Sequence, residues 1–117
     1  MVEWRNLIPP SEEVVLATNG NFYEFDEEKE KSQLGLIVLT KSKIYLVHQK
    51  GLAMGVAKLH AAIPLETATN MQVTGSMIRY LEFDYLANSH KKHAKFISFD
   101  YEVRELLEEI EYAADNI

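Results

Sequence analysis

The stretch Gly35-Leu36-Ile37-Val38-Leu39-Thr40-Lys41-Ser42-Lys43-Ile44-Tyr45-Leu46-Val47-His48 contains two aliphatic runs separated by a short polar turn. Two such runs on either side of a polar turn are typical of an antiparallel hairpin. Strands of this kind pack one face on a core and leave polar groups for solvent. The stretch therefore predicts an antiparallel β framework around which the rest of the chain packs.

The composition is that of one soluble globular domain. The chain has 117 residues, of which 47% are hydrophobic and 26% are charged, a balance that permits a single packed core. Cysteine is absent, which excludes disulfides, thiolate nucleophiles and cysteine-based zinc sites. No window holds the roughly 20 apolar residues of a membrane span, and the first residues do not resemble a signal peptide. We therefore predict a cytoplasmic protein.

Further strands are expected wherever β-branched and aromatic residues cluster. The first is long and bent at Asn19-Gly20-Asn21, and a charged, solvated loop over residues 26–32 follows it. An apolar loop over residues 49–60 separates the third and fourth strands. The expected strands cover residues 14–25, 33–40, 43–49, 63–65, 71–78, 80–86 and 94–99.

The period of the pattern changes near the C-terminus. Asp100 is a candidate N-cap, and apolar residues then recur at helical spacing, at Val103, Leu106, Leu107, Ile110, Ala114 and Ile117. This predicts one amphipathic helix that packs on the sheet. Residues 1–12 contain Pro9-Pro10 and form a lead-in anchored by Trp4, Leu7 and Ile8, ahead of a single domain over residues 13–117.

Two short motifs carry a resemblance to a known family. One is the hairpin motif from Leu39-Thr40 to Lys43-Ile44-Tyr45, and the other is Ile63-Pro64-Leu65 followed by Ala68 and Met71. With them the chain resembles the bacterial pleckstrin-homology and GRAM-like families, although Lys43 stands where arginine is more usual and Ala68 is smaller than expected. The resemblance covers residues 13–117. It implies a mainly β fold, a seven-stranded antiparallel, partly open barrel of two nearly orthogonal sheets, capped at one end by the C-terminal α-helix.

Charge is unevenly distributed along the chain. The net charge is −6, with acidic residues concentrated in residues 24–31 and 100–117, whereas residues 41–95 are basic. Such asymmetry can mark a face for an anionic partner, but single lysines on strand edges also discourage unwanted pairing, and we favour this second interpretation. The resemblance places the loops 24–32, 49–60 and 88–93 at the open end of the barrel. Because the first of these is acidic, tight phosphoinositide binding is not expected.

Two groups of residues are candidate binding sites. The first is an interaction loop of apolar residues between lysines, which suits either insertion into an anionic membrane surface or packing on the barrel or a second subunit; we favour packing. Its residues are Lys50, Leu52, Met54, Val56 and Lys58. The second is a basic patch of Lys91, Lys92, His93 and Lys95. The four histidines lie in or beside these loops, but neighbouring lysines oppose a bound cation, so we expect surface histidines and no metal site.

These features favour a noncatalytic binding or scaffold module that engages a protein partner or assembles with itself through sheet edges and loops. The alternative is a peripheral membrane adaptor that binds anionic lipid through the 50–58 loop and nearby lysines. A small-ligand enzyme is the third possibility, and no nucleophile or paired-carboxylate motif supports it. We expect no catalytic residues, no cofactor and no nucleic-acid partner, because an acidic domain lacks the basic field that attracts nucleic acid.

Overall fold

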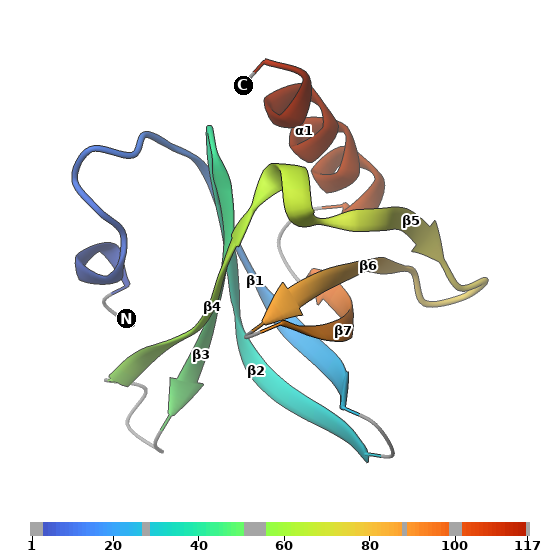
Figure 1. Ribbon diagram of the computed structural model, residues 1–117. Coiled ribbons are helices and arrows are strands. Elements are labelled where there is room, and N and C mark those ends of the chain that lie inside the picture. Colours follow the sequence, from blue (N-terminus) through green and yellow to red (C-terminus); the bar gives the residue numbers. More distant parts are fainter. Residues whose placement is uncertain (1–3, 27–28, 51–55, 88, 99–101, 117) are drawn as a thin grey trace.

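The computed structural model describes residues 4–26, 29–50, 56–87, 89–98 and 102–116. Within these ranges the chain forms seven strands followed by one α-helix (Figure 1), as the sequence predicts. The elements are β1 (Val14–Asp26), β2 (Lys29–Thr40), β3 (Lys43–Lys50), β4 (Val56–Pro64), β5 (Thr69–Thr74), β6 (Tyr80–Ala87), β7 (His90–Ser98) and α1 (Val103–Asp115). Short 3-10 helices cover Arg5–Leu7 and Leu65–Thr67.

The strands form one continuous antiparallel sheet in the order β4-β3-β2-β1-β7-β6-β5. Because β4 and β5 stand at the two ends of this order and do not pair with each other, the barrel is partly open. Figure 1 shows the sheet curling so that β5 and β6 face β2 and β3, with α1 at one end of the molecule and the free ends of β1, β2, β3 and β4 at the other. The predicted fold class is therefore confirmed.

Two segments expected to be loops are largely strand. The hairpin of β1 and β2 continues through the charged segment, and its register places Asp26 opposite Lys29 and Glu24 opposite Lys31. The strand therefore extends into the charged run that was expected to be a loop. The apolar loop also ends earlier than expected, since β4 begins at Val56. The strand expected over residues 71–78 differs in the opposite sense, because β5 ends at Thr74 and does not reach Ile78.

The main core lies inside the curled sheet. It includes Phe22 from β1, Ile37 from β2 and Phe83 from β6, all fully buried. Helix α1 closes one end of this core with Val103, Leu106, Ile110 and Ala113. The helix begins after Glu102, whereas the expected cap Asp100 lies outside the described residues. Ala113, not Ala114, completes the buried stripe because a period of 3.6 residues keeps it in line with Leu106 and Ile110.

A second, smaller core lies on the outer face of β2 and β3. Leu36 and Val38 from β2, with Tyr45 and Val47 from β3, are buried there. Ile8 from the N-terminal segment is buried against them. Trp4 and Leu7 pack at the edge of this cluster, so all three expected anchors of the lead-in contact the sheet. The hairpin that decides the fold is consequently buried on both faces.

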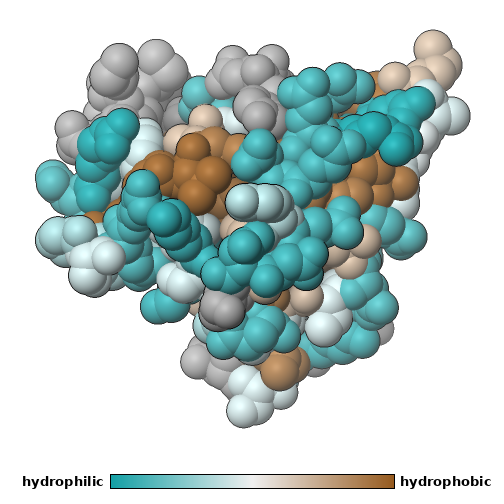
Figure 2. Space-filling model, turned by 90° about the horizontal axis from the view of Figure 1, so that it is seen from above, coloured by the Kyte–Doolittle hydropathy of each residue, from teal (hydrophilic) through white to brown (hydrophobic). Residues whose placement is uncertain are grey.

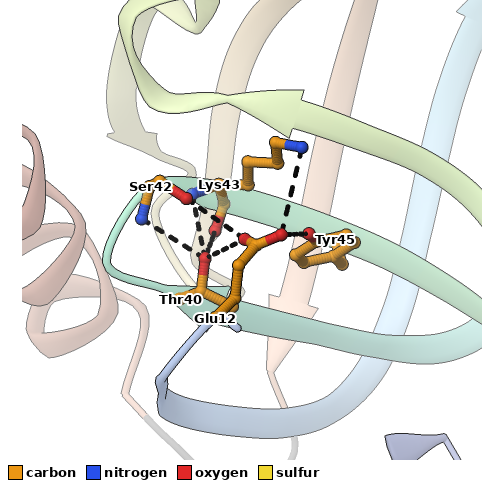
Figure 3. Close-up of polar contacts among 5 residues, drawn as sticks. All are labelled: Glu12, Thr40, Ser42, Lys43 and Tyr45. Atoms are coloured by element: carbon orange, nitrogen blue, oxygen red, sulfur yellow. Dashed lines mark hydrogen bonds and ion pairs between the residues drawn. The ribbon is translucent and has the colours of Figure 1, made fainter. Parts of the chain in front are cut away.

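Glu12 fixes the end of the N-terminal segment to the turn between β2 and β3 (Figure 3). Its Oε1 accepts hydrogen bonds from Thr40 Oγ1 at 2.9 Å and Ser42 Oγ at 3.1 Å, and the Tyr45 hydroxyl donates to Oε2. Lys43 Nζ lies 3.9 Å from Oε2. Burial acts to raise the pKa of Glu12, but these hydrogen bonds and the charge of Lys43 outweigh it and hold the pKa below the usual 4.5. Burial and the contact with Glu12 raise the pKa of Tyr45.

We expect Glu12→Ala to lower the free energy of unfolding by about 1–3 kcal/mol at neutral pH, because three hydroxyl donors lose their acceptor. The neighbouring Glu13→Ala is a matched control. Glu13 forms an ion pair with Lys41 at 2.7 Å, but both side chains are about 70% exposed, and such pairs contribute about 0–1 kcal/mol. Urea denaturation of the two variants measures the difference.

The Glu12 effect also depends on pH in a defined direction. A carboxyl with a lowered folded pKa stabilises the protein above its unfolded value of 4.5 and loses that contribution as the pH falls through the folded pKa. The difference in free energy of unfolding between the parent protein and Glu12→Ala should therefore become smaller below pH 4.5. Equal effects of the two glutamate variants at neutral pH would show that Glu12 does not fix the segment.

Candidate binding surfaces

Several basic side chains lie on the face of the sheet that carries the core. The ring of His60 lies 5.4 Å from that of Phe22 and 6.1 Å from that of His48. Lys58 is the cross-strand partner of His48 and shares its face. Lys92 is the partner of the buried Tyr85 and faces the same way. Thus two of the four histidines do come together, and two lysines lie on the same face.

The predicted interaction loop is only partly described. Leu52 and Met54 lie outside the described residues. Lys50 and Val56 occupy the last position of β3 and the first of β4 and pair with each other. Lys58 is exposed on β4. The role of this loop stays a prediction.

The predicted basic patch is divided between the two faces of β7. Lys92 lies on the core-bearing face, whereas Lys91, His93 and Lys95 alternate with it and lie on the outer face. On that face the register places Asp84 opposite His93 and Glu82 opposite Lys95. Lys91 Nζ is 3.7 Å from Asp84 Oδ2, and Lys95 Nζ lies 5.4 Å from the Tyr80 ring centroid. Acidic and basic groups are therefore mixed on this face.

His93 bridges two carboxylates on the outer face of β6. Its Nδ1 is 2.7 Å from Asp84 Oδ1, and its Nε2 is 2.7 Å from Glu82 Oε1. Since ionised carboxylates only accept hydrogen bonds, both ring nitrogens donate when the ring is protonated. Asn70 Nδ2 also donates to Asp84 Oδ2 at 2.8 Å. The alternation of residues 80–86 puts the two acids on one face of β6, but nothing in that pattern connects them with His93.

The three groups shift one another's pKa values. Burial acts to lower the pKa of His93, but the hydrogen bonds and charges of Asp84 and Glu82 outweigh it and raise the pKa above 6.5. Burial acts to raise the pKa of Glu82, yet hydrogen bonds from Thr74 and His93 and the charge of Lys95 lower it. Hydrogen bonds from Asn70 and His93 lower the pKa of Asp84 against an opposing effect of burial.

We expect the His93 bridge to stabilise the fold most between about pH 4.5 and 6.5. Because the pKa of His93 is higher in the folded state, the bridge stabilises that state fully when the pH is below the unfolded pKa of 6.5. This stabilisation is lost as the pH rises through the folded pKa. The two carboxyl groups have lowered pKa values in the folded state, so they stabilise it above their unfolded pKa values of 4.5 for Glu82 and 3.8 for Asp84. This stabilisation is lost as the pH falls through the folded pKa values.

Proton NMR of the His93 ring should accordingly give a titration midpoint above 6.5. The melting temperature of His93→Gln should fall furthest below that of the parent inside the window given above. His90→Gln, on an exposed position of the same strand, controls for loss of an imidazole. A midpoint at or below 6.5, or a pH-independent effect of His93→Gln, would contradict the bridge.

No group of three or more metal-ligating side chains in a metal-binding arrangement occurs among the described residues. In the same part of the chain, no helix has the length and apolar character needed to span a membrane.

Both ends of the sheet present a strand edge. Among the described strands, β4 at one end pairs only with β3, and β5 at the other pairs only with β6. Helix α1 contacts β5 and the 3-10 helix that precedes it, so the β5 end is flanked by the helix. The β4 end carries Lys58, Pro64 as its last residue and one register shift against β3. Between Leu59 and Ile63 it has neither a lysine nor a proline.

Solved structures share this fold at low sequence identity. The hSac2 domain from the human phosphoinositide phosphatase Sac2 superposes with a TM-score of 0.67 at 11% identity, over 96% of this chain and 76% of that one. A pleckstrin-homology domain from Shewanella amazonensis gives a TM-score of 0.55 at 20% identity, over 92% and 78% of the two chains. A structure of the Vav1 exchange factor with its PH and C1 domains gives 0.56 at 14% identity, and the chain spans 26% of it.

The sequence itself matches no protein-family model and no curated protein. The likeness therefore rests on strand order, capping helix and superposition. Two of these neighbours contain pleckstrin-homology domains by name, whereas the expected likeness to GRAM-like proteins stays a prediction. This chain has a pleckstrin-homology-like fold.

Proposed function

We propose that this chain is a noncatalytic binding module that engages a protein partner, or another copy of itself, through its open sheet edges and loops. The observation that carries the proposal is the position of β4 at one end of the strand order. An edge strand presents a row of backbone donors and acceptors that another strand can pair with. The five residues Leu59–Ile63 form a run long enough for such pairing.

The β4 edge is suited to a protein partner by its side chains. Ala57, Ala61 and Ala62 are small and allow a second strand to approach. Leu59 is 37% exposed and lies opposite Val47 on the outer face, so a paired strand can cover it.

A noncatalytic role is supported by where the titratable groups lie. The strongest cluster, His93 with Glu82 and Asp84, is on the outer face of the sheet. None of these three residues lines the depressions of about 390, 150 and 380 Å³ in the described surface. Catalytic acids and bases usually converge in a pocket that excludes water.

The experiment compares Leu59→Lys with Leu86→Lys. Both place a lysine at an exposed leucine, but Leu86 is on β6, near the opposite end of the strand order from β4, and is 60% exposed. We expect a partner captured by the parent protein, or a concentration-dependent molar mass measured by light scattering, to survive Leu86→Lys and to be lost with Leu59→Lys. Equal behaviour of the two variants would remove the β4 edge from the proposal.

The second candidate function is a peripheral membrane adaptor. Lys58 and Lys92 lie on the same face of the sheet, and His48 and His60 lie close to each other. Each lysine near an anionic membrane surface contributes about 1 kcal/mol. Sedimentation with phosphatidylserine vesicles tests this. Lys58→Glu and Lys92→Glu should each reduce binding, while Arg104→Glu on α1, with the same change of charge, should not. No sedimentation of the parent protein would remove this function.

A further inference from the structure

The turn between β5 and β6 presents two neighbouring apolar side chains to solvent. Met77 is 95% exposed and Ile78 is 56% exposed. Scattered exposed apolar residues are normal on a protein surface, but turns are usually built from glycine, proline, asparagine, aspartate and serine. Two large adjacent apolar side chains at a turn therefore require an explanation.

The turn is held in a shape that keeps these side chains outward. Gly75 has φ of +94°, and a Cβ at this position would lie 2.0 Å from the Ile78 carbonyl oxygen. Only glycine adopts such a backbone with such a close contact at low cost. The tight approach of Gly75 to Ile78 fixes the course of the turn between them.

A depression of about 380 Å³ lies beside the exposed side chains. Its walls come from the turn, from the end of β7 and from the start of α1, with Met77, Ile78, Arg79, Ile97, Glu102 and Val103 among them. Figure 2 shows hydrophobic residues reaching the surface on the right-hand side of the molecule, the side that carries this turn in Figure 1. An apolar projection thus stands next to a partly apolar hollow, with one positive and one negative residue around it.

We infer that this surface, called here the tip surface (Met77, Ile78, Arg79, Ile97 and Glu102), binds the tip surface of a second copy of the chain about a two-fold axis. The inference rests on the self-association included in the proposed function and names one surface for it. In a two-fold interface the same patch must complement itself. The tip surface meets this condition because the apolar projection borders the hollow, and one positive and one negative residue, Arg79 and Glu102, line the same hollow.

The two-fold arrangement determines the contacts. Met77 of each copy enters the hollow of the other, where Ile97 and Val103 provide apolar contacts. Arg79 of each copy faces Glu102 of the other, which gives two symmetric ion pairs. An anionic membrane is a poorer occupant, because Glu102 at the same depression repels anionic headgroups. The charges thus favour a protein surface with the same pair of charges in reverse order.

Charge reversal tests this pairing on the full chain by sedimentation equilibrium. Arg79→Glu and Glu102→Arg each set like charges against one another in both symmetric contacts, and we expect each to weaken self-association at least about tenfold. An equimolar mixture of the two variants sets acid against base in both contacts. The mixture should therefore recover association as a heterodimer, which a variant that had merely misfolded cannot do.

Truncation of the apolar projection gives an independent measurement. Met77→Ser should weaken association at least about tenfold, because the Met77 side chain no longer fills the hollow. Leu86→Ser, at an exposed apolar residue outside the tip surface, should leave association unchanged. A monomeric parent protein at every concentration, or a mixture that fails to recover, would overturn the inference. Association lost with Leu59→Lys but retained by every tip variant would overturn it too, while leaving the proposed function intact. Vesicle binding that is lost with Met77→Ser, without any self-association, would assign the tip to a membrane instead and overturn the inference.

Discussion

Gly20→Ala is expected to destabilise the protein by about 3 kcal/mol, at the upper end of the usual cost of overpacking. A Cβ at Gly20 would lie 1.8 Å from the Ile97 carbonyl oxygen and 2.8 Å from the Phe96 ring. The first of these neighbours is backbone of β7, so it cannot move aside without disturbing strand pairing. Gly20 also pairs with Ser98 of β7, which places the clash within the hydrogen-bonded part of the sheet.

The opposite glycine shows the same constraint. Gly35 is the cross-strand partner of Gly20, and a Cβ at Gly35 would lie 2.1 Å from the Val47 carbonyl oxygen. These two paired glycines therefore let β1 approach β7 closely and β2 approach β3 closely. Glycines at such positions are a common way for a sheet to curl into a barrel.

Urea denaturation monitored by circular dichroism measures the Gly20→Ala effect. Ala17→Val is the control. It also adds carbon to β1, but Ala17 is exposed whereas Gly20 is buried, so it should change the free energy of unfolding by less than about 0.5 kcal/mol. If Gly20→Ala were as stable as the parent, the close approach of β1 to β7 would have to be abandoned.

The core of the fold is predictable because its signals are local. The alternation of Leu81, Phe83 and Tyr85 identifies the buried face of β6 without knowledge of its neighbours, and all three are buried. The stripe containing Leu106 and Ile110 identifies the helix in the same way. In both cases the period of side-chain direction is a property of one element alone.

Features that depend on pairing are harder to predict. Asn19-Gly20-Asn21 suggests flexibility at a bend, whereas the structure uses Gly20 for close backbone approach, with continuous register from Leu16 to Asp26. The start of β4 is missed because Ala57, Ala61 and Ala62 have low strand propensity, and pairing with β3 decides their conformation. The charged end of the first hairpin is missed for a similar reason, since composition does not reveal the register in which two strands pair.

The His93 bridge has no local sequence signal, but part of it follows from the pairing of two consecutive strands. Neither Glu82, Asp84 nor His93 is remarkable in the linear sequence, and charge counting assigns His93 to a basic patch. Counting outward from the short turn between β6 and β7, however, pairs Asp84 with His93, as observed. The pairing behind the bridge is therefore accessible from hairpin register, although the side-chain hydrogen bonds that shift the pKa values are not.

Leu106→Ala is expected to lower the free energy of unfolding by about 2–5 kcal/mol, the usual range for truncating a buried leucine. Leu106 is fully buried within the core cluster and belongs to the stripe by which α1 closes the end of the barrel. The alanine retains high helix propensity. The expected loss therefore reports the docking of the helix on the sheet and not the stability of the helix itself.

Leu107→Ala makes the same chemical change one residue further along α1, at a side chain that is only partly buried. It should cost clearly less than Leu106→Ala in the same urea titration. Hydrogen exchange of the α1 amides adds a second measurement, because weakened docking should speed exchange in the helix before the central strands are affected. Equal costs for the two leucines would mean that α1 does not close the barrel through Leu106, and the fold would then need another explanation for how its open core is kept from water.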